Sequence, residues 1–454
     1  MDINRTITAI STSYGIGGIG IIRISGKQSF FILKKLVKKN MCKNRYAYHA
    51  EIYDFNHIII DNGIILKFKK PYSYTGEDVV EIHSHGNYIL LEKILSTICF
   101  YGAIIAKPGE FTYRAFINKK IDLLQAESIN NLIHAQTLSA AKAAQRSLKG
   151  DFSRVINNII DNIIQLRIYI ESTIDFAEED IDDITEKNIN RKLLKIINYL
   201  NEVFELIKSE EKINREIKIV ITGEPNVGKS TLINKISKNQ ISIVTKYAGT
   251  TRDLVKSKIS LNGTLIEIVD TAGIHESSNI IEKYGIKIAK EEIKKSDIKM
   301  NIICAEKLKK SKYGIVSYVK KLIKKKKEKE ILVINKIDLL KKQEIKNLTD
   351  IQKIILISAK KSIGIKNLIK KIDFLLKKYH SVENNFLARK RHLTALKKSL
   401  KYLKKSYSIL NHQGNFEFLA NELYLSQLSL EEVTGQFTSD DLLGRIFSEF
   451  CIGK

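Results

Sequence analysis

The chain has 454 residues, 44% of them hydrophobic, so it is too long for one ordinary core and should form two or three domains. Its net charge of +26 indicates either a polyanionic partner such as nucleic acid or the Lys-, Ile- and Asn-rich composition that AT-rich coding produces. The four cysteines lack metal-ligand spacing, no apolar run approaches 18 residues, and no signal-peptide core is present. These features argue against structural zinc, disulfide and membrane-spanning classes and favour a cytoplasmic protein.

The period of the apolar residues changes along the chain. Residues 1–118 alternate short β-branched runs with Gly-bearing turns and predict an α+β domain. Residues 119–212 carry apolar residues at helical spacing, and residues 380–454 do so again. Residues 213–379 contain near-continuous apolar strands alternating with helices, typical of a parallel sheet. We therefore predict a multidomain α/β + α protein, with a Ras-like P-loop module inserted between the halves of a helical domain.

The stretch "GIGGIG" (15–20) satisfies the GxGxxG dinucleotide fingerprint, but its context is wrong. That fingerprint needs a helix after the last glycine, whereas "IIRIS" has the pattern of a strand. We predict no dinucleotide site here.

The inserted module contains a phosphate-binding loop. "GEPNVGKST" (223–231) fits GxxxxGK[ST] and follows an apolar strand. Backbone N–H groups of such a loop wrap phosphates, the Lys229 ammonium reaches the β- and γ-phosphates, and the Ser230 hydroxyl holds Mg²⁺.

Further motifs in the same order specify guanine. "DTAG" (270–273) ends a strand near the metal, and "AGTTRD" (248–253) supplies Thr251 as a second Mg²⁺ ligand. In "NKID" (335–338), Asp338 can accept two hydrogen bonds from guanine that adenine cannot donate. The predicted GTP-binding residues are Asn226, Val227, Gly228, Lys229, Ser230, Thr231, Thr245, Lys246, Tyr247, Ala248, Gly249, Thr250, Thr251, Asp270, Thr271, Ala272, Gly273, Asn335, Lys336, Asp338, Ser358, Ala359 and Lys360.

A monovalent cation is predicted beside the phosphates. Ile274 follows "DTAG", where signalling GTPases carry the Gln that positions water. The side chains of Asn226 and Thr250, with the carbonyls of Thr245 and Tyr247, could replace the hydration shell of K⁺. A cation there would neutralise developing phosphate charge.

With these motifs in place, the whole chain resembles the tRNA-modification GTPases of the MnmE (TrmE) type. The resemblance includes "SYTGEDVVEIHSHG" (73–86), "KPGEFTYRAFINKKIDLLQAES" (107–128) and the ending "EEVTGQFTSDDLLGRIFSEFCIGK" (431–454). It implies a homodimer that works with the flavoprotein MnmG (GidA), as a heterotetramer or larger complex, on the wobble uridine (position 34) of certain tRNAs. The expected product carries a (carboxymethyl)aminomethyl group on C5, with a 5-formyl or 5,10-methylene tetrahydrofolate as the one-carbon source.

The resemblance also implies roles for individual residues. Arg23, Glu81, Lys120 and Lys454 match folate-contacting positions, within an N-terminal domain for folate binding and dimerisation. Glu282 matches the acidic residue that helps to position the attacking water.

The C-terminal Cys451 is either a small buried hydrophobe or a catalytic thiol beside the folate. "TSDDLLGRIFSEF" predicts a helix docked through Leu442, Leu443, Ile446, Phe447 and Phe450, with "CIGK" extending beyond it.

Two other functions stay open from the sequence: an RNA-binding ribosome-assembly GTPase, and a regulatory switch without chemistry of its own. The cations of "FLARKRH" (386–392) predict a solvated helix face, with RNA contact as the alternative.

Overall fold

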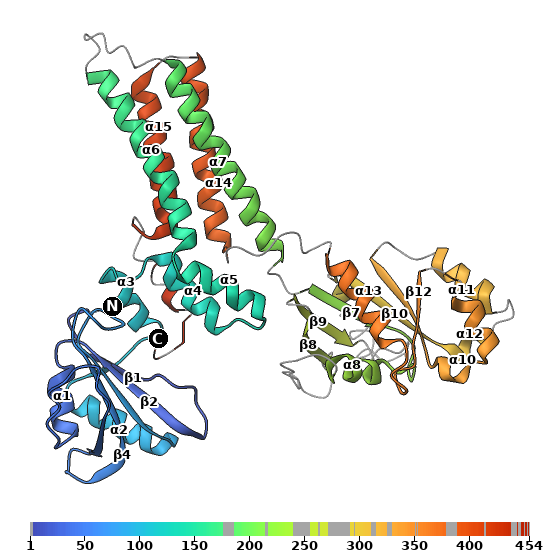
Figure 1. Cartoon of the computed structure of the whole chain (residues 1–454), viewed down its shortest axis with the longest axis horizontal. Helices are drawn as coiled ribbons and strands as arrows, with labels where there is room; N and C mark the ends of the chain where they lie inside the picture. Colours follow the sequence, from blue (N-terminus) through green and yellow to red (C-terminus); the bar gives the residue numbers. More distant parts are fainter. Residues whose placement is uncertain are drawn as a thin grey trace, which may run out of the picture. The chain divides into compact units, whose positions relative to one another are not determined.

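A computed structural model describes residues 3–175, 186–213, 217–238, 255–261, 264–270, 291–294, 296–309, 315–324, 329–349, 351, 353–377, 388–412, 415–436, 443, 446–448, 450–451 and 453. The chain forms two compact units (Figure 1). The first unit joins residues 1–133, 144–206 and 389–454, and the second joins 134–143 and 207–388. Helices α5 (Leu138–Leu148) and α7 (Glu186–Ile213) contribute to both.

The first unit begins with a six-stranded mixed sheet in the order β3-β4-β5-β2-β1-β6. Only β1 and β6 pair in parallel. The strands are β1 (Ile7–Ile10), β2 (Gly17–Ser25), β3 (Tyr48–Tyr53), β4 (Ile59–Phe68), β5 (Val79–Gly86) and β6 (Ile104–Ile105). Because β2 begins inside "GIGGIG" and no helix follows the last glycine, the prediction of a strand there is confirmed.

Alternation along β2 separates a core face from a polar face. Ile22 and Ile24 lie in a hydrophobic core with α1 (Ser29–Leu36) and α2 (Tyr88–Phe100). Arg23 points to the opposite face, because successive strand residues alternate in direction. On that face, Phe111 of α3 (Glu110–Ile117) packs with Ile7 and Ala9 of β1.

The helical part of the first unit is built on the long helices α6, α7, α14 and α15 (Figure 1). Helix α15 (Phe416–Thr434) packs against α14 (Lys390–His412) and α6 (Asp151–Asp175). Helix α7 lies beside α14, where Asn190 donates a hydrogen bond to Asn411 over 3.0 Å. Apolar residues at helical spacing form the contact faces, as the sequence pattern predicts.

A buried polar network joins the two sequence-distant halves of this bundle. Glu127 on α4 (Leu123–Ile133) accepts hydrogen bonds from Nε and Nη2 of Arg391, both over 2.8 Å. His392 donates from Nε2 to the same carboxylate over 2.8 Å. Arg391 also donates to the carbonyls of Glu432 and Val433 near the end of α15.

One further contact fixes the protonation state of His392. Its Nδ1 accepts the backbone N–H of Arg389 over 3.1 Å, as in a capping box at the start of α14, so the ring is neutral. Burial, with Arg391 and Arg389 nearby, lowers the pKa of His392 despite the opposing effect of Glu127. Burial would raise the pKa of Glu127, but His392 and Arg391 outweigh it and hold that pKa far below its ordinary value. Because Arg391 is engaged internally, the interpretation of "FLARKRH" as a solvated or RNA-binding face is wrong for this residue.

The C-terminal segment docks on the same unit. Leu443, Ile446, Phe447 and Phe450 pack with Leu123 and other apolar residues of α3 and α4, as predicted, while Leu442 lies outside the described residues. Gly435 ends α15 with φ +87°, and a Cβ there would lie 2.7 Å from Cβ of Leu123. The close approach at Gly435 therefore helps to direct the chain back toward the N-terminal sheet.

The second unit is built on a six-stranded sheet in the order β12-β11-β10-β7-β9-β8. Every pair is parallel except β8 with β9, which confirms the predicted, mostly parallel α/β module. Its strands are β7 (Ile217–Thr222), β8 (Val255–Leu261), β9 (Thr264–Asp270), β10 (Ile298–Cys304), β11 (Glu330–Asn335) and β12 (Ile354–Leu356). Its described helices include α8 (Lys229–Lys238), α10 (Ala305–Lys309), α11 (Ile315–Lys324), η1 (Ile337–Leu339), α12 (Lys342–Thr349) and α13 (Ile365–Lys377).

Removing the charge of Glu127 should weaken the first unit. Glu127→Gln leaves the Arg391 guanidinium without its carboxylate, and breaking such a buried pair costs about 3 kcal/mol. Urea unfolding of the first unit measures this loss. Glu432→Gln is the matched control: its side chain pairs with Lys398 at the surface, 3.3 Å away, and should cost under about 1 kcal/mol. Equal losses in the two variants would contradict the network's role.

The same network makes stability depend on pH. The pKa values of both His392 and Glu127 are lowered on folding, so the unfolded chain binds more protons than the native one. The free energy of unfolding should therefore fall as the pH drops below the ordinary His pKa of 6.5, and further near 4.5. Unfolding curves between pH 8 and pH 4 measure this, and Glu127→Gln should show a shallower dependence. A wild-type free energy that is constant across this range would be inconsistent with it.

Candidate active site

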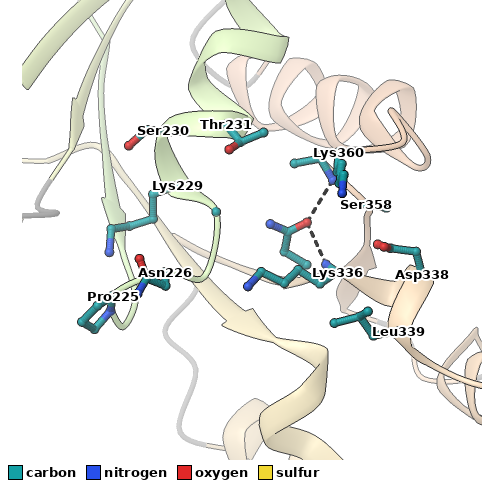
Figure 2. Close-up of a pocket in the computed structure, with 13 residues that line it drawn as sticks. Pro225, Asn226, Lys229, Ser230, Thr231, Lys336, Asp338, Leu339, Ser358 and Lys360 are labelled. Carbon is teal, nitrogen blue, oxygen red and sulfur yellow. Dashed lines mark hydrogen bonds between the residues drawn. The ribbon is translucent and has the colours of Figure 1, made fainter.

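The second unit holds a cavity of about 830 Å³ at the carboxyl ends of its parallel strands. Figure 2 shows the loop after β7 on one side and the loops after β11 and β12 on the other. Of the predicted nucleotide-binding residues, Asn226, Gly228, Lys229, Ser230, Thr231, Asn335, Lys336, Asp338, Ser358, Ala359 and Lys360 line it. Val227, in the same loop, is buried beneath it. Ligands bind at this edge in open α/β sheets.

The loop after β7 has the backbone geometry of a phosphate cradle. Asn226 and Gly228 have φ values of +58° and +93°. A Cβ on Gly228 would lie 2.5 Å from Nδ2 of Asn335, and one on Gly223 would lie 2.4 Å from the carbonyl of Ile302. Glycine is therefore required at both positions, since a side chain would push the loop out of the cavity.

Lys229 begins α8 directly beneath this loop. Its ammonium donates to the carbonyls of Gly223 over 2.7 Å and Glu224 over 2.9 Å, and the residue is 5% exposed. These bonds hold the cation inside the loop curve, where it can exchange a carbonyl for a phosphate oxygen. The N-terminus of α8 adds its dipole at the same place.

Asn335 joins the three loops that bound the cavity. Its Nδ2 donates to the carbonyl of Val227 over 2.7 Å, while its Oδ1 accepts the N–H groups of Lys336 and Ala359 (Figure 2). Because these bonds engage both the nitrogen and the oxygen of the buried amide, the role of Asn335 in this structure is to hold the three loops at a fixed spacing.

Asp338 provides an acceptor on the far side of the cavity. Its Oδ1 is buried and makes no hydrogen bond within the part of the chain that the structure describes. A hydrogen bond from Ser358, with Lys361 and Lys360 nearby, holds the pKa of Asp338 below its ordinary value despite burial. An ionised, unpaired carboxylate oxygen suits a base that offers N–H donors, as guanine does.

The remaining predicted residues of this unit are only partly placed. Asp270 ends β9, paired with Ile221 of β7, so its backbone lies beside the phosphate loop. Residues 245–251, 271–273 and Glu282 lie outside the described residues.

A second group of predicted residues lies on the polar face of the N-terminal sheet. Arg23 donates from Nε to Glu81 over 2.9 Å, and its Nη2 lies 2.8 Å from the same oxygen. The guanidinium carbon of Arg23 lies 5.4 Å from the ring centre of Tyr74 and 5.6 Å from that of Phe111. The result is a mostly buried ion pair, with both side chains 18% exposed, against two aromatic rings.

His83 completes this face and was not predicted as a site residue. Its Nε2 lies 3.5 Å from Glu81 and is buried without a hydrogen bond to any residue that the structure describes. The alternation of β5 indicates it, because residues 81 and 83 share a face.

Lys120 and the C-terminal segment approach the same region. The Lys120 stem packs beside Gly76, where a Cβ would lie 3.3 Å from Cγ of Lys120. The carbonyl of Cys451 accepts the N–H of Gly109 over 3.4 Å, and the residue is exposed. Gly453 is buried at the end of β1, where its carbonyl accepts the hydroxyl of Ser11 over 3.2 Å. Lys454 lies outside the described residues.

A buried cation, Arg114, holds together the segments next to this region. Arg114 is fully buried and binds Glu77 and Glu110, each over 3.0 Å. Glu77 also accepts the hydroxyl of Ser25 over 2.7 Å. The motifs "SYTGED" and "KPGEFTYR" thus supply the frame of the site, a role that their spacing alone does not reveal.

The fold and cavity of the second unit define the chain as a P-loop enzyme that binds and hydrolyses GTP. A family model described as "GTP-binding protein TrmE N-terminus" matches residues 6–120, and one described as "MnmE helical domain" matches residues 123–451. The chain is 40% identical over 456 residues to "tRNA modification GTPase MnmE" from Coxiella burnetii and 42% identical over 454 residues to that from Francisella philomiragia, each covering 99% of both chains.

The chain therefore belongs to the MnmE family of tRNA modification GTPases. A solved structure of Aquifex aeolicus Era bound to GDP·AlF4⁻ is 28% identical over 41% of this chain and 67% of its own, with a TM-score of 0.28. The full-length family match favours tRNA modification over the ribosome-assembly alternative. No helix among the described residues is long and apolar enough to cross a membrane.

Lys229→Ala should abolish tight GTP binding. The substitution removes the cation from the loop and leaves two carbonyls without their donor, so the Kd for GTP should rise by about 100-fold or more. Calorimetric titration measures it. Lys307→Ala is the control, because Lys307 is a half-exposed cation paired with Glu224 at the loop. Retained affinity in Lys229→Ala would show that the cavity is not the nucleotide site.

Proposed function

We propose that this enzyme is a K⁺-dependent GTPase of a complex that adds a (carboxymethyl)aminomethyl group to C5 of the wobble uridine, using a tetrahydrofolate one-carbon unit. The observation that carries this proposal is the docking of the C-terminal segment on the N-terminal domain. Cys451 and Gly453 lie at α3 and β1, next to the strand that carries Arg23. A polar site for carbon transfer in the first unit thus accompanies a GTP site in the second.

We propose the domain roles that the sequence pattern indicates. Residues 1–118 bind folate and dimerise, 119–212 and 380–454 form the helical domain, and 213–379 bind GTP. The compact units support the separation of the inserted module from the rest.

In the GTP site, the chain's own groups position and neutralise the phosphates. The loop amides and Lys229 hold the β- and γ-phosphates, and Asp338 orients guanine. Ser230 and Thr231 lie at the start of α8 on the cavity wall (Figure 2). Ser230, together with Thr251, would hold Mg²⁺, which neutralises charge on the phosphate oxygens. Glu282 is proposed to position the attacking water.

The proposed K⁺ site is described only through Asn226. Its left-handed backbone places it on the rim of the cavity, and a neutral amide oxygen is a suitable ligand for a monovalent cation. The proposed partners Thr245, Tyr247 and Thr250 come from the following loop.

We expect GTP hydrolysis to be faster in KCl than in NaCl at equal ionic strength. K⁺ would neutralise transition-state charge, a contribution worth about 10²-fold in kcat when a comparable electrostatic group is removed. Asn226→Ala should remove the difference between the salts. Phosphate-release assays at saturating GTP measure it, with Asn226→Asp as a variant that retains an oxygen ligand. Equal wild-type rates in the two salts would exclude the cation.

The Arg23 face has a chemistry that fits a folate. The Arg23 guanidinium and the Lys120 ammonium suit the glutamyl carboxylates of a folate, as does the proposed Lys454. Glu81 suits the edge of the pterin ring that donates N–H groups. Tyr74, which is 37% exposed, offers a ring face, and the Nε2 of His83, which has no hydrogen-bond partner among the described residues, offers a further polar contact. The folate would supply the carbon, while these residues bind and orient it.

Cys451 is proposed as the catalytic thiol of this site. Its exposure leaves the sulfur accessible, whereas a purely structural thiol would be buried. Cys451→Ser should lower the modified fraction of wobble uridine by at least tenfold while GTP hydrolysis and folate affinity stay normal. Nucleoside mass spectrometry of tRNA from complemented cells measures it. Full modification in this variant would assign Cys451 a structural role.

We propose a homodimer, a flavoprotein partner of the MnmG type, tRNA as the substrate, and a cytoplasmic location. The dimer is supported by an apolar surface at the starts of β2 and α2. Each of its aromatic and aliphatic residues is at least 52% exposed: Tyr14, Ile16, Ile19, Tyr88 and Ile89.

A further inference from the structure

The charges of the helical bundle are segregated by helix. Helix α14 contains seven Lys and Arg residues and no Asp or Glu, namely Lys390, Arg391, Lys397, Lys398, Lys401, Lys404 and Lys405. Helix α15 has the reverse composition, with Glu417, Glu422, Glu431 and Glu432 and no Lys or Arg. These two helices pack against each other.

A lysine-rich composition alone does not explain this separation of charge between helices. Drift toward lysine would place that residue on every solvated helix, yet α6 (25 residues) and α15 (19 residues) contain none. On α14, lysines recur at i and i+4, where like charges repel and destabilise an isolated helix. Coding bias toward lysine therefore does not explain where these lysines lie.

Contacts with α15 and α4 account for part of the charge. Arg391 binds Glu127, Lys398 pairs with Glu432 over 3.3 Å, and Lys405 pairs with Glu422. Each of these pairs is internal to the unit. They explain why α14 is basic on the sides that face its neighbours.

Four lysines of α14 are left over: Lys390 at the first position of the helix, and three further along its outward face. Lys397, Lys401 and Lys404 follow one another at i, i+4 and i+7 and are exposed. None of them forms an ion pair with any residue that the structure describes. Thr394 and Ser408 continue the same face toward the helix ends, so it is polar throughout and lacks the apolar centre of a protein interface. We name this set, Lys397, Lys401 and Lys404, the α14 lysine face.

We propose that the α14 lysine face binds the phosphate backbone of RNA, and that it positions the tRNA substrate on the helical bundle. A row of lysines one helical turn apart is a line of point charges, which suits a polyphosphate strand rather than a single small anion. The inference rests on tRNA being the substrate of this enzyme. It places the RNA contact beyond the arginines that begin α14, because those are held in the buried network.

The test uses the full-length protein and the triple variant Lys397→Gln, Lys401→Gln, Lys404→Gln. Glutamine removes the charge and keeps nearly the same helix propensity. The Kd for tRNA should rise about tenfold or more at 0.1 M KCl, and the slope of log K against log salt should become shallower by about 2. Filter binding across a salt series measures both values.

The matched control is Lys366→Gln, Lys370→Gln, Lys371→Gln on α13, which removes three exposed lysines from another helix of the same chain. It should bind tRNA within twofold of wild type, and GTP hydrolysis should be unchanged in both triple variants. If both triple variants lost tRNA affinity equally, binding would depend on overall charge and the assignment would be overturned. Wild-type tRNA affinity in the α14 triple variant would also overturn it. Loss of association with the flavoprotein alone, with tRNA binding intact, would reassign the face to a protein partner and overturn it as well. Failure of wild-type protein, with or without its flavoprotein, to bind tRNA would instead count against the proposed function itself.

Discussion

The carboxylate of Glu127 connects the two halves of the helical bundle, which the inserted GTPase module separates in the sequence. Its two strongest partners, Arg391 and His392, lie more than 260 positions further along the chain, after the chain has left the first unit and returned. An insertion of this size separates the two halves of a core in the sequence. Contacts between the halves must therefore specify where the second half packs against the first. Hydrogen bonds to a buried charge do this more selectively than apolar packing, because any misplacement leaves the charge unpaired.

The same network has consequences for the proposed carbon-transfer site. Arg391 holds the end of α15 through the carbonyls of Glu432 and Val433. Beyond it, Gly435 turns the chain, and Phe447 and Phe450 pack on α3 and α4. The segment that carries Cys451 thus starts from a fixed point and ends against the N-terminal sheet. The C-terminal segment thus lies beside α3 and β1, next to the strand that carries Arg23.

Polar groups in both units are used in two distinct ways. Asn335, Arg114 and Arg391 donate hydrogen bonds to groups within the protein and hold segments of the chain in place. Asp338 Oδ1 and His83 Nε2 are buried without such partners among the described residues, and the α14 lysine face is exposed without them. Since a buried polar atom without a hydrogen bond is costly, Asp338 and His83 indicate where ligands belong.

The sequence by itself determined the class of each domain and the nucleotide motifs. Continuous apolar strands, helical periodicity and GxxxxGK[ST] are local patterns, and their structural meaning depends on neighbours within one or two turns of chain. Tertiary structure alone decided which charges work inside the molecule. Arg391 and Lys401 look alike in sequence, yet one binds a carboxylate on a distant helix and the other faces solvent. The same holds for Asn335, whose side chain connects the loops around the cavity. Such roles depend on contacts between residues far apart in the chain, and those contacts exist only after folding.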